Sequence, residues 1–197
     1  MPKIIDIVPN DFAVTTVEAA NIIGSMSAKL YKKLQQAEIV SDDITIDEVA
    51  DLATRPWVRL DEALPVLRIG PAVEVEPDPD DDRRFYGFAT SLTDDQVLNG
   101  VLRYWVSNSE NVVGKPMVVT IATFVVACVQ ITGVDRERTE LVERRTAYTG
   151  DLLARLSGPL QGGEEEYDTG DFGSDLIGKR LWAQGGGPLC FSDGTRQ

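Results

Sequence analysis

The sequence predicts an α+β protein made of two units, and three observations lead to this fold class. Residues up to about 60 place apolar side chains at helical spacing. An acidic stretch with prolines follows. Beyond it, the 18-residue run 117–134 is rich in β-branched residues, which favour strands. The predicted architecture is a small helical unit plus a mainly antiparallel β domain, open or closed into a barrel, with one helix.

The first unit, residues 1–60, is expected to hold three short helices. Each begins after a threonine or serine whose side chain can accept a backbone N–H bond. Gly24 can end the first helix in a left-handed conformation, and Pro56 ends the third. The expected helices span about residues 17–23, 28–37 and 46–54, capped by Thr15 or Thr16, by Ser27, and by Thr45 with Glu48 in a capping box.

The second of these helices has two unlike faces. Its apolar face, with Tyr31 at the edge, is expected to complete the core of the first unit, formed by Ile22, Ile23, Leu30 and Leu34. The opposite face carries Lys29, Lys32, Lys33 and Gln36. A basic face on a helix is either a solvated surface or a surface that meets an anionic partner.

The stretches "VTTVEAANIIG", "SAKLYKKLQQAEI" and "ITIDEVADL" fall between residues 14 and 52. They resemble the winged helix-turn-helix of phage excisionases and MerR-like regulators, in which the second helix enters the major groove. The resemblance implies double-stranded DNA as a partner. On the basic face, Lys29, Lys32 and Lys33 would contact phosphates, while Ser27 and Gln36 would reach base edges.

One departure from those families concerns the wing. Where they place a basic hairpin, this chain has "VSDD" at residues 40–43, without an arginine. Together with the net charge of -13, this predicts weak DNA binding by the protein alone. A protein partner or a second copy of the chain would then be required.

Residues 61–82 are expected to form an acidic, proline-rich linker. They hold eight acidic residues against Arg68 alone, and Pro77 and Pro79 interrupt the acids at their end. Carboxylate repulsion and proline both favour an extended, solvated chain. The alternative is an acidic surface loop within one domain.

The sheet domain is expected over residues 83–160. A strand at residues 83–90, a helix capped by Thr93 and a hairpin that turns near Ala122–Thr123 are predicted, followed by a strand within residues 140–150. Residues 161–197 are expected to form a glycine-rich acidic tail with a short terminal strand. Lys179 and Arg180 near Gly185–Gly187 indicate either an anion site or, as we favour, a loop.

Composition narrows the possible functions. The chain has no histidine, which excludes histidine-based catalysis and imidazole metal ligands. Cys128 lies in an apolar run and is expected to be a buried thiol. No catalytic residue, metal site or cofactor is predicted, and a carboxylate-metal enzyme is the least favoured class. No segment is typical of a signal peptide or a membrane helix, so no membrane association and a cytoplasmic location are expected.

Two functions therefore follow from the sequence. The first is a non-enzymatic DNA-binding protein, either a regulator or a recombination accessory factor of a phage or mobile element. The alternative is a structural or adaptor protein of a larger assembly, such as a virion or a multiprotein complex.

Limited proteolysis tests the proposed linker. The native protein should be cut first within residues 76–82 or 161–175, because charged, glycine- and proline-rich segments pack poorly. Mass spectrometry of the first fragments locates the cuts. Early cleavage inside residues 17–52 or 117–134, with residues 76–82 protected, would contradict the prediction.

Overall fold

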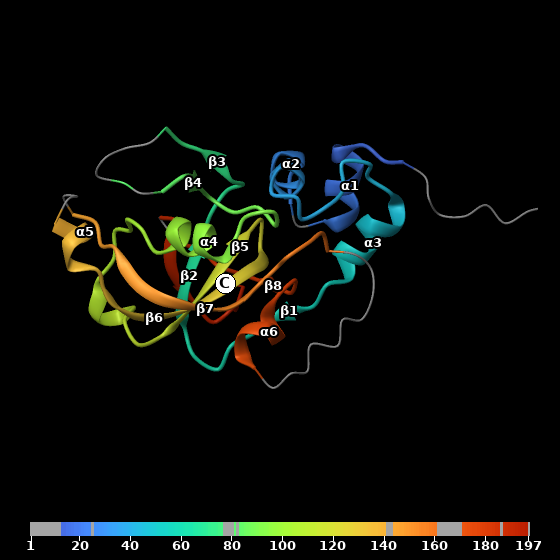
Figure 1. Cartoon of the computed structure of the whole chain (residues 1–197). Coiled ribbons are helices and arrows are strands. Elements are labelled where there is room, and N and C mark those ends of the chain that lie inside the picture. Colours follow the sequence, from blue (N-terminus) through green and yellow to red (C-terminus); the bar gives the residue numbers. More distant parts are fainter. Residues whose placement is uncertain are drawn as a thin grey trace, which may run out of the picture.

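Helices and strands both contribute to the structure, a computed structural model that describes residues 13–24, 26–76, 81, 83–140, 144–160, 171–185 and 187–196. Three helices lie together at one end, and a curled sheet with further short helices makes up the remainder (Figure 1). The predicted α+β class is confirmed.

The three N-terminal helices start and end close to where the sequence predicts. They are α1 (Thr16–Ile23), α2 (Ala28–Gln36) and α3 (Ile46–Thr54). Thr15, Ser27 and Thr45 cap them, and Thr15 forms a reciprocal capping box with Glu18. The box predicted at α3 is only half made. Thr45 accepts the Glu48 N–H, but the Glu48 carboxylate instead accepts bonds from Ser41.

Among the described residues, the main sheet has seven strands in the order β1-β8-β6-β5-β2-β9, with β7 also paired to β6. The pairs β1–β8 and β2–β5 are parallel and the other pairs are antiparallel. The strands are β1 (Trp57–Val58), β2 (Leu64–Arg68), β5 (Pro116–Ile121), β6 (Phe124–Val134), β7 (Tyr148–Arg155), β8 (Arg180–Leu181) and β9 (Leu189–Ser192).

A separate two-stranded ribbon and several short helices complete the fold. The ribbon pairs β3 (Val73–Glu74) with β4 (Phe85–Tyr86), the latter within the strand predicted at residues 83–90. The helix predicted after Thr93 is confirmed as α4 (Asp94–Val101). Within residues 83–160, where one helix was predicted, the structure adds a 3₁₀ turn, η1 (Ser109–Asn111), and the helix α5 (Arg136–Glu140). The helix α6 (Phe172–Leu176) lies in the segment predicted as a tail.

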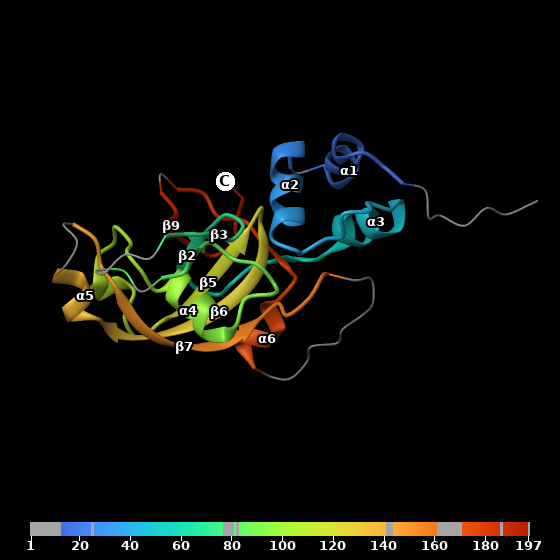
Figure 2. The same cartoon turned by 45° about the horizontal axis from the view of Figure 1, so that its top comes forward.

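The long apolar run folds as the predicted hairpin. Ala122 and Thr123, with φ of 48° and 82°, form the turn between β5 and β6. The register between β6 and β7 shifts at Cys128/Val129 and again at Ile131/Gly133. Such bulges increase local twist, which accounts for the curl of the sheet in Figure 2.

The linker prediction requires a correction. Residues 64–68 lie within the predicted 61–82 linker, yet they form β2, which pairs with both β5 and β9. Leu64, Val66 and Leu67 are buried. The acidic residues of the whole segment favoured a linker, although residues 64–67 form an apolar stretch, which is buried between two strands. Residues 77–80 and 82 lie outside the described residues.

The strand predicted within residues 140–150 was placed too early. Residues 136–140 form α5, and β7 begins only at Tyr148. The Thr139 hydroxyl accepts the Ala147 N–H at 3.1 Å and links the end of the helix to the start of the strand. The predicted range overlaps β7 only at residues 148–150, and residues 141–143 lie outside the described residues.

The buried apolar residues of the helices and of the sheet form one continuous core. Ile23 and Leu34 are buried as predicted, and Tyr31, expected at the edge, is fully buried. Two predictions fail. Ile22 is 45% exposed, and Leu30 is only half-buried. Cys128 is buried as predicted, and burial raises the pKa of its thiol to about 12.

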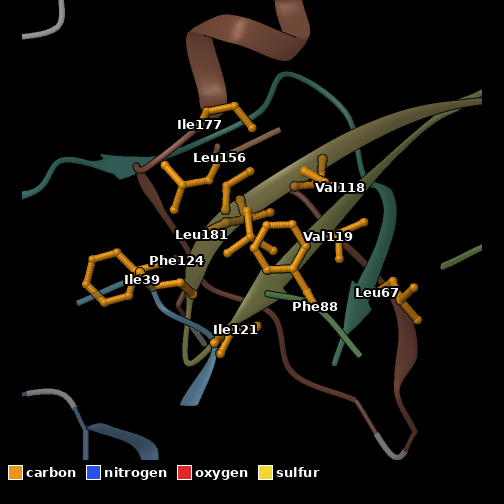
Figure 3. Packing of buried hydrophobic residues seen from close by; sticks show 14 of the residues in the cluster. Ile39, Leu67, Phe88, Val118, Val119, Ile121, Phe124, Leu156, Ile177 and Leu181 are labelled. Atoms are coloured by element: carbon orange, nitrogen blue, oxygen red, sulfur yellow. The ribbon is translucent and has the colours of Figure 1, made fainter. Parts of the chain in front are cut away.

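The segment after α2 attaches the helices to the sheet domain. The carbonyl of Ala37 accepts the Thr90 N–H at 3.2 Å, and the carbonyl of Ile39 accepts the Leu160 N–H at 2.8 Å. The Ile39 side chain is fully buried and lies among core residues of the sheet (Figure 3). The position of α2 relative to the sheet is therefore defined by backbone bonds and by core packing.

The contrast between Leu34 and Ile22 gives a matched test of the core. Leu34→Ala should lower the free energy of unfolding by about 2–5 kcal/mol, because it leaves a cavity at a fully buried position. Ile22→Ala, at a half-exposed position, should cost less than about 1 kcal/mol. Urea titration followed by circular dichroism measures both, and equal losses would show that the α1 face is packed.

Candidate functional site

Helix α2 begins at an exposed, capped end. Gly24, with φ of 71°, ends α1 and lets the chain turn back. Ser27 then accepts the Leu30 N–H at 3.4 Å. Because this cap uses an oxygen lone pair, the hydroxyl proton of Ser27 can still be donated to another acceptor.

The five residues predicted to contact DNA lie on α2 or at its cap, but they do not share one surface. Ser27, Lys29, Lys32 and Gln36 are exposed, whereas Lys33 is half-buried. Lys33 lines a cavity together with Leu30, the residue wrongly placed in the core. Leu30 and Lys33 therefore face the sheet, whereas the four exposed side chains face solvent.

The solvent face of α2 is positively charged. The helix contains three lysines and no acidic residue. Along the chain its nearest acidic neighbours are Glu18 and Glu38. Hydrogen bonds from Thr15 lower the pKa of Glu18, and hydrogen bonds from Ser91 and Thr90 lower the pKa of Glu38. Both carboxylates stay ionised at neutral pH, but each is already engaged by its own donors.

The connection from α2 to α3 is a turn and not a hairpin. The Ser41 N–H donates to Glu48 at 2.8 Å, and the Gln35 side-chain amide donates to the Asp42 carbonyl at 3.3 Å. Residues 37–44, all of which the structure describes, contain no strand. The place of a basic wing is therefore taken by two exposed carboxylates, Asp42 and Asp43.

A cavity of about 810 Å³ lies between α2 and one end of the sheet, and we refer to it as the α2 cavity. Its walls come from α2, the end of β2, the β5–β6 turn and the segment after β8. Figure 2 shows α2 between this end of the sheet and the other two helices, α1 and α3. The lining residues with polar or large side chains include Leu30, Lys33, Arg68, Thr123, Trp182 and Gln184.

Arg68, at the end of β2, organises one wall of the α2 cavity. Its guanidinium donates to the carbonyls of Ala183 at 3.4 Å, of Gly185 at 2.7 Å and of Gly187. The planar group presents several donors in fixed directions, which suits several carbonyls at once. The segment that contains Gly185 and Gly187, which we call the glycine segment, therefore turns carbonyl oxygens toward this arginine.

This arrangement bears on the alternative anion site at Gly185–Gly187. Carbonyls that accept from Arg68 are not backbone donors for an anion, and a loop leading to β9 is found, as favoured. Arg180 does not accompany this loop. It is buried, and its guanidinium lies 4.1 Å from the centre of the Trp57 ring. Gly186 lies outside the described residues.

The α2 cavity was not predicted from the sequence. Lys33, Arg68, Thr123 and Trp182 belong to four separate segments, and no spacing between them marks a site. Of these four residues, only Lys33 is a predicted site residue, and there it is predicted to contact DNA phosphates. A cavity assembled by tertiary packing leaves no local pattern that sequence inspection could detect.

No protein-family model, curated protein or solved structure matches this chain. Within the part of the chain that the structure describes, no group of three or more Cys, Asp or Glu residues is placed to hold a metal ion. In that same part, no helix has the length and apolarity needed to cross a bilayer.

Proposed function

We propose that this protein is a non-enzymatic DNA-binding protein that docks α2 on duplex DNA, as a cytoplasmic regulator or a recombination accessory factor. The observation that carries the proposal is the exposed face of α2, on which Lys29, Lys32 and Gln36 project from a capped helix without an acidic residue. The two-helix arrangement with a glycine turn and the resemblance to excisionase and MerR-like sequences support it.

The geometry suggests how each residue would act. The major groove of B-DNA is about 12 Å wide and accepts a helix whose N-terminal part faces the bases. Ser27, at the exposed start of α2, can donate its hydroxyl to a phosphate or a base edge. Lys29 and Lys32 supply charge to the phosphates, and Gln36 can pair with an adenine edge.

The total charge of -13 does not exclude this role, because fields are screened over about 8 Å at physiological salt. It does limit the affinity. With three lysines on one helix and two exposed carboxylates in place of a wing, few phosphates can be neutralised. We therefore propose that the protein binds DNA together with a second copy of the chain, which supplies another α2, or together with a protein partner.

A salt titration tests the proposal. Binding to random duplex DNA, followed by fluorescence anisotropy, should weaken as salt rises. Lys29→Gln, Lys32→Gln and Lys33→Gln combined should weaken binding to all sequences and flatten the log–log salt slope by about one unit per lost phosphate contact. Gln36→Ala should instead change sequence preference.

A control with the same change in charge is available at the other end of the molecule. Arg136, Arg144 and Arg145 are exposed near α5, far from α2 in both views (Figures 1 and 2). Their triple glutamine variant should keep the wild-type salt slope. If the two triple variants behave alike, α2 is not the contact surface. If the intact protein shows no salt-dependent binding even at low salt, the adaptor function is favoured instead.

A further inference from the structure

The α2 cavity has the size of a small-molecule site. Its volume of about 810 Å³ falls within the roughly 300–1,000 Å³ typical of ligand pockets. It lies where four parts of the chain meet, namely α2, the end of β2, the β5–β6 turn and the segment after β8. Sites between packed units of a protein are common places for ligands, because they are concave without any loss of core packing.

The charge of its lining is unusual for this protein. The described residues that line the α2 cavity include Lys33 and Arg68 but no aspartate or glutamate. The whole chain, by contrast, has 32 acidic residues against 19 basic ones. A concave site with two cations and no anion attracts negative charge and repels cations, and its low-dielectric walls strengthen this preference.

Three lining residues also carry donors without partners. Among the described residues, no acceptor bonds the Arg68 Nε, the Trp182 Nε1 or the Thr123 hydroxyl, although each of these atoms is buried. Leaving a buried donor unpaired costs about 1–3 kcal/mol. These atoms have almost no solvent-accessible surface, so they lie behind the wall of the cavity, and the charge that a ligand meets there comes from Lys33 and Arg68.

The rest of the lining is apolar. Leu30, Ile69 and Pro188 contribute aliphatic surface, and Trp182 contributes an aromatic ring. An inorganic anion alone would leave this surface wet. A ligand that satisfies both parts of the lining has an apolar body and one anionic group.

We propose that the α2 cavity is a binding site for a small organic anion, with the acidic group toward Lys33 and the apolar body against Leu30, Ile69 and Trp182. Lys33 is the residue that selects charge, since the Arg68 guanidinium is already engaged with the carbonyls of the glycine segment. This inference does not depend on DNA binding.

Two fluorescent probes with the same body test the site on the intact protein. 8-Anilinonaphthalene-1-sulfonate carries an anionic group, and N-phenyl-1-naphthylamine is the same body without it. We expect saturable binding of the sulfonate at one site per chain. Lys33→Met should weaken the sulfonate roughly tenfold, the loss of one charge-assisted contact, and leave the neutral probe unchanged.

Lys32→Met is the matched control, since Lys32 lies on the solvent face of the same helix. It should bind both probes as the wild type does. Thr123→Val keeps the β-branched shape and serves as a second control at the cavity wall. It should leave the affinity for the sulfonate unchanged, because the Thr123 hydroxyl is buried away from the cavity, while the protein melts at the same or a higher temperature because an unpaired hydroxyl has been removed.

Three results would overturn the proposal. These are the absence of saturable sulfonate binding, equal sulfonate affinity in Lys33→Met and the wild type, and equal losses for the sulfonate and the neutral probe in Lys33→Met. No DNA is present in this experiment. A failure here therefore leaves the proposed function standing, and a failure of DNA binding leaves this site standing.

Discussion

The attachment of α2 to the sheet domain is the constraint on which both candidate surfaces depend. Immediately after the helix, the carbonyls of Ala37 and Ile39 accept hydrogen bonds from N–H groups of the sheet domain. Glu38, between these two residues, adopts a φ of 59°. Its carboxylate accepts the Ser91 N–H at 2.9 Å. A left-handed residue held by its own side chain makes a tight joint, so α2 is presented at a fixed position beside the sheet.

Because the joint holds α2 beside the sheet, the two sides of this helix lie in different environments. The side of α2 that meets water carries Lys29, Lys32 and Gln36, while the side that meets the sheet carries Leu30 and Lys33. Leu34, on the remaining side of the helix, is fully buried. A helix on the surface of a simple bundle would leave Lys33 in solvent. Here the sheet approaches closely enough to cover Lys33 in part, and Arg68 holds the glycine segment as the opposite wall.

The elements that the sequence predicted well are those determined by local chemistry. Thr15, Ser27 and Thr93 each cap a helix by accepting a hydrogen bond from the N–H group three residues later. Ala122 and Thr123 form the turn of a hairpin, which was predicted because the apolar run is too long for one strand. The failures concern long-range packing. Residues 64–68 looked like part of an acidic linker because their partners, β5 and β9, lie more than 50 and 120 residues further along the chain. Ile22 and Leu30 matched a helical apolar pattern, but periodicity does not say which apolar side chain a neighbour covers.

Lys33 links the two proposals, because it belongs to the basic set of α2 and to the wall of the cavity. Its ammonium group cannot make a close contact with a phosphate of DNA and with an anion in the cavity at the same time. The two ligands would then compete for one charge, and such a coupling is reciprocal: an anion that weakens DNA binding by some factor is itself weakened by DNA by the same factor. The coupling is bounded by what one lysine contributes, which is about tenfold. The arrangement needs no movement of α2, since the joint at residues 37–39 stays as it is while the ligands exchange at a single side chain.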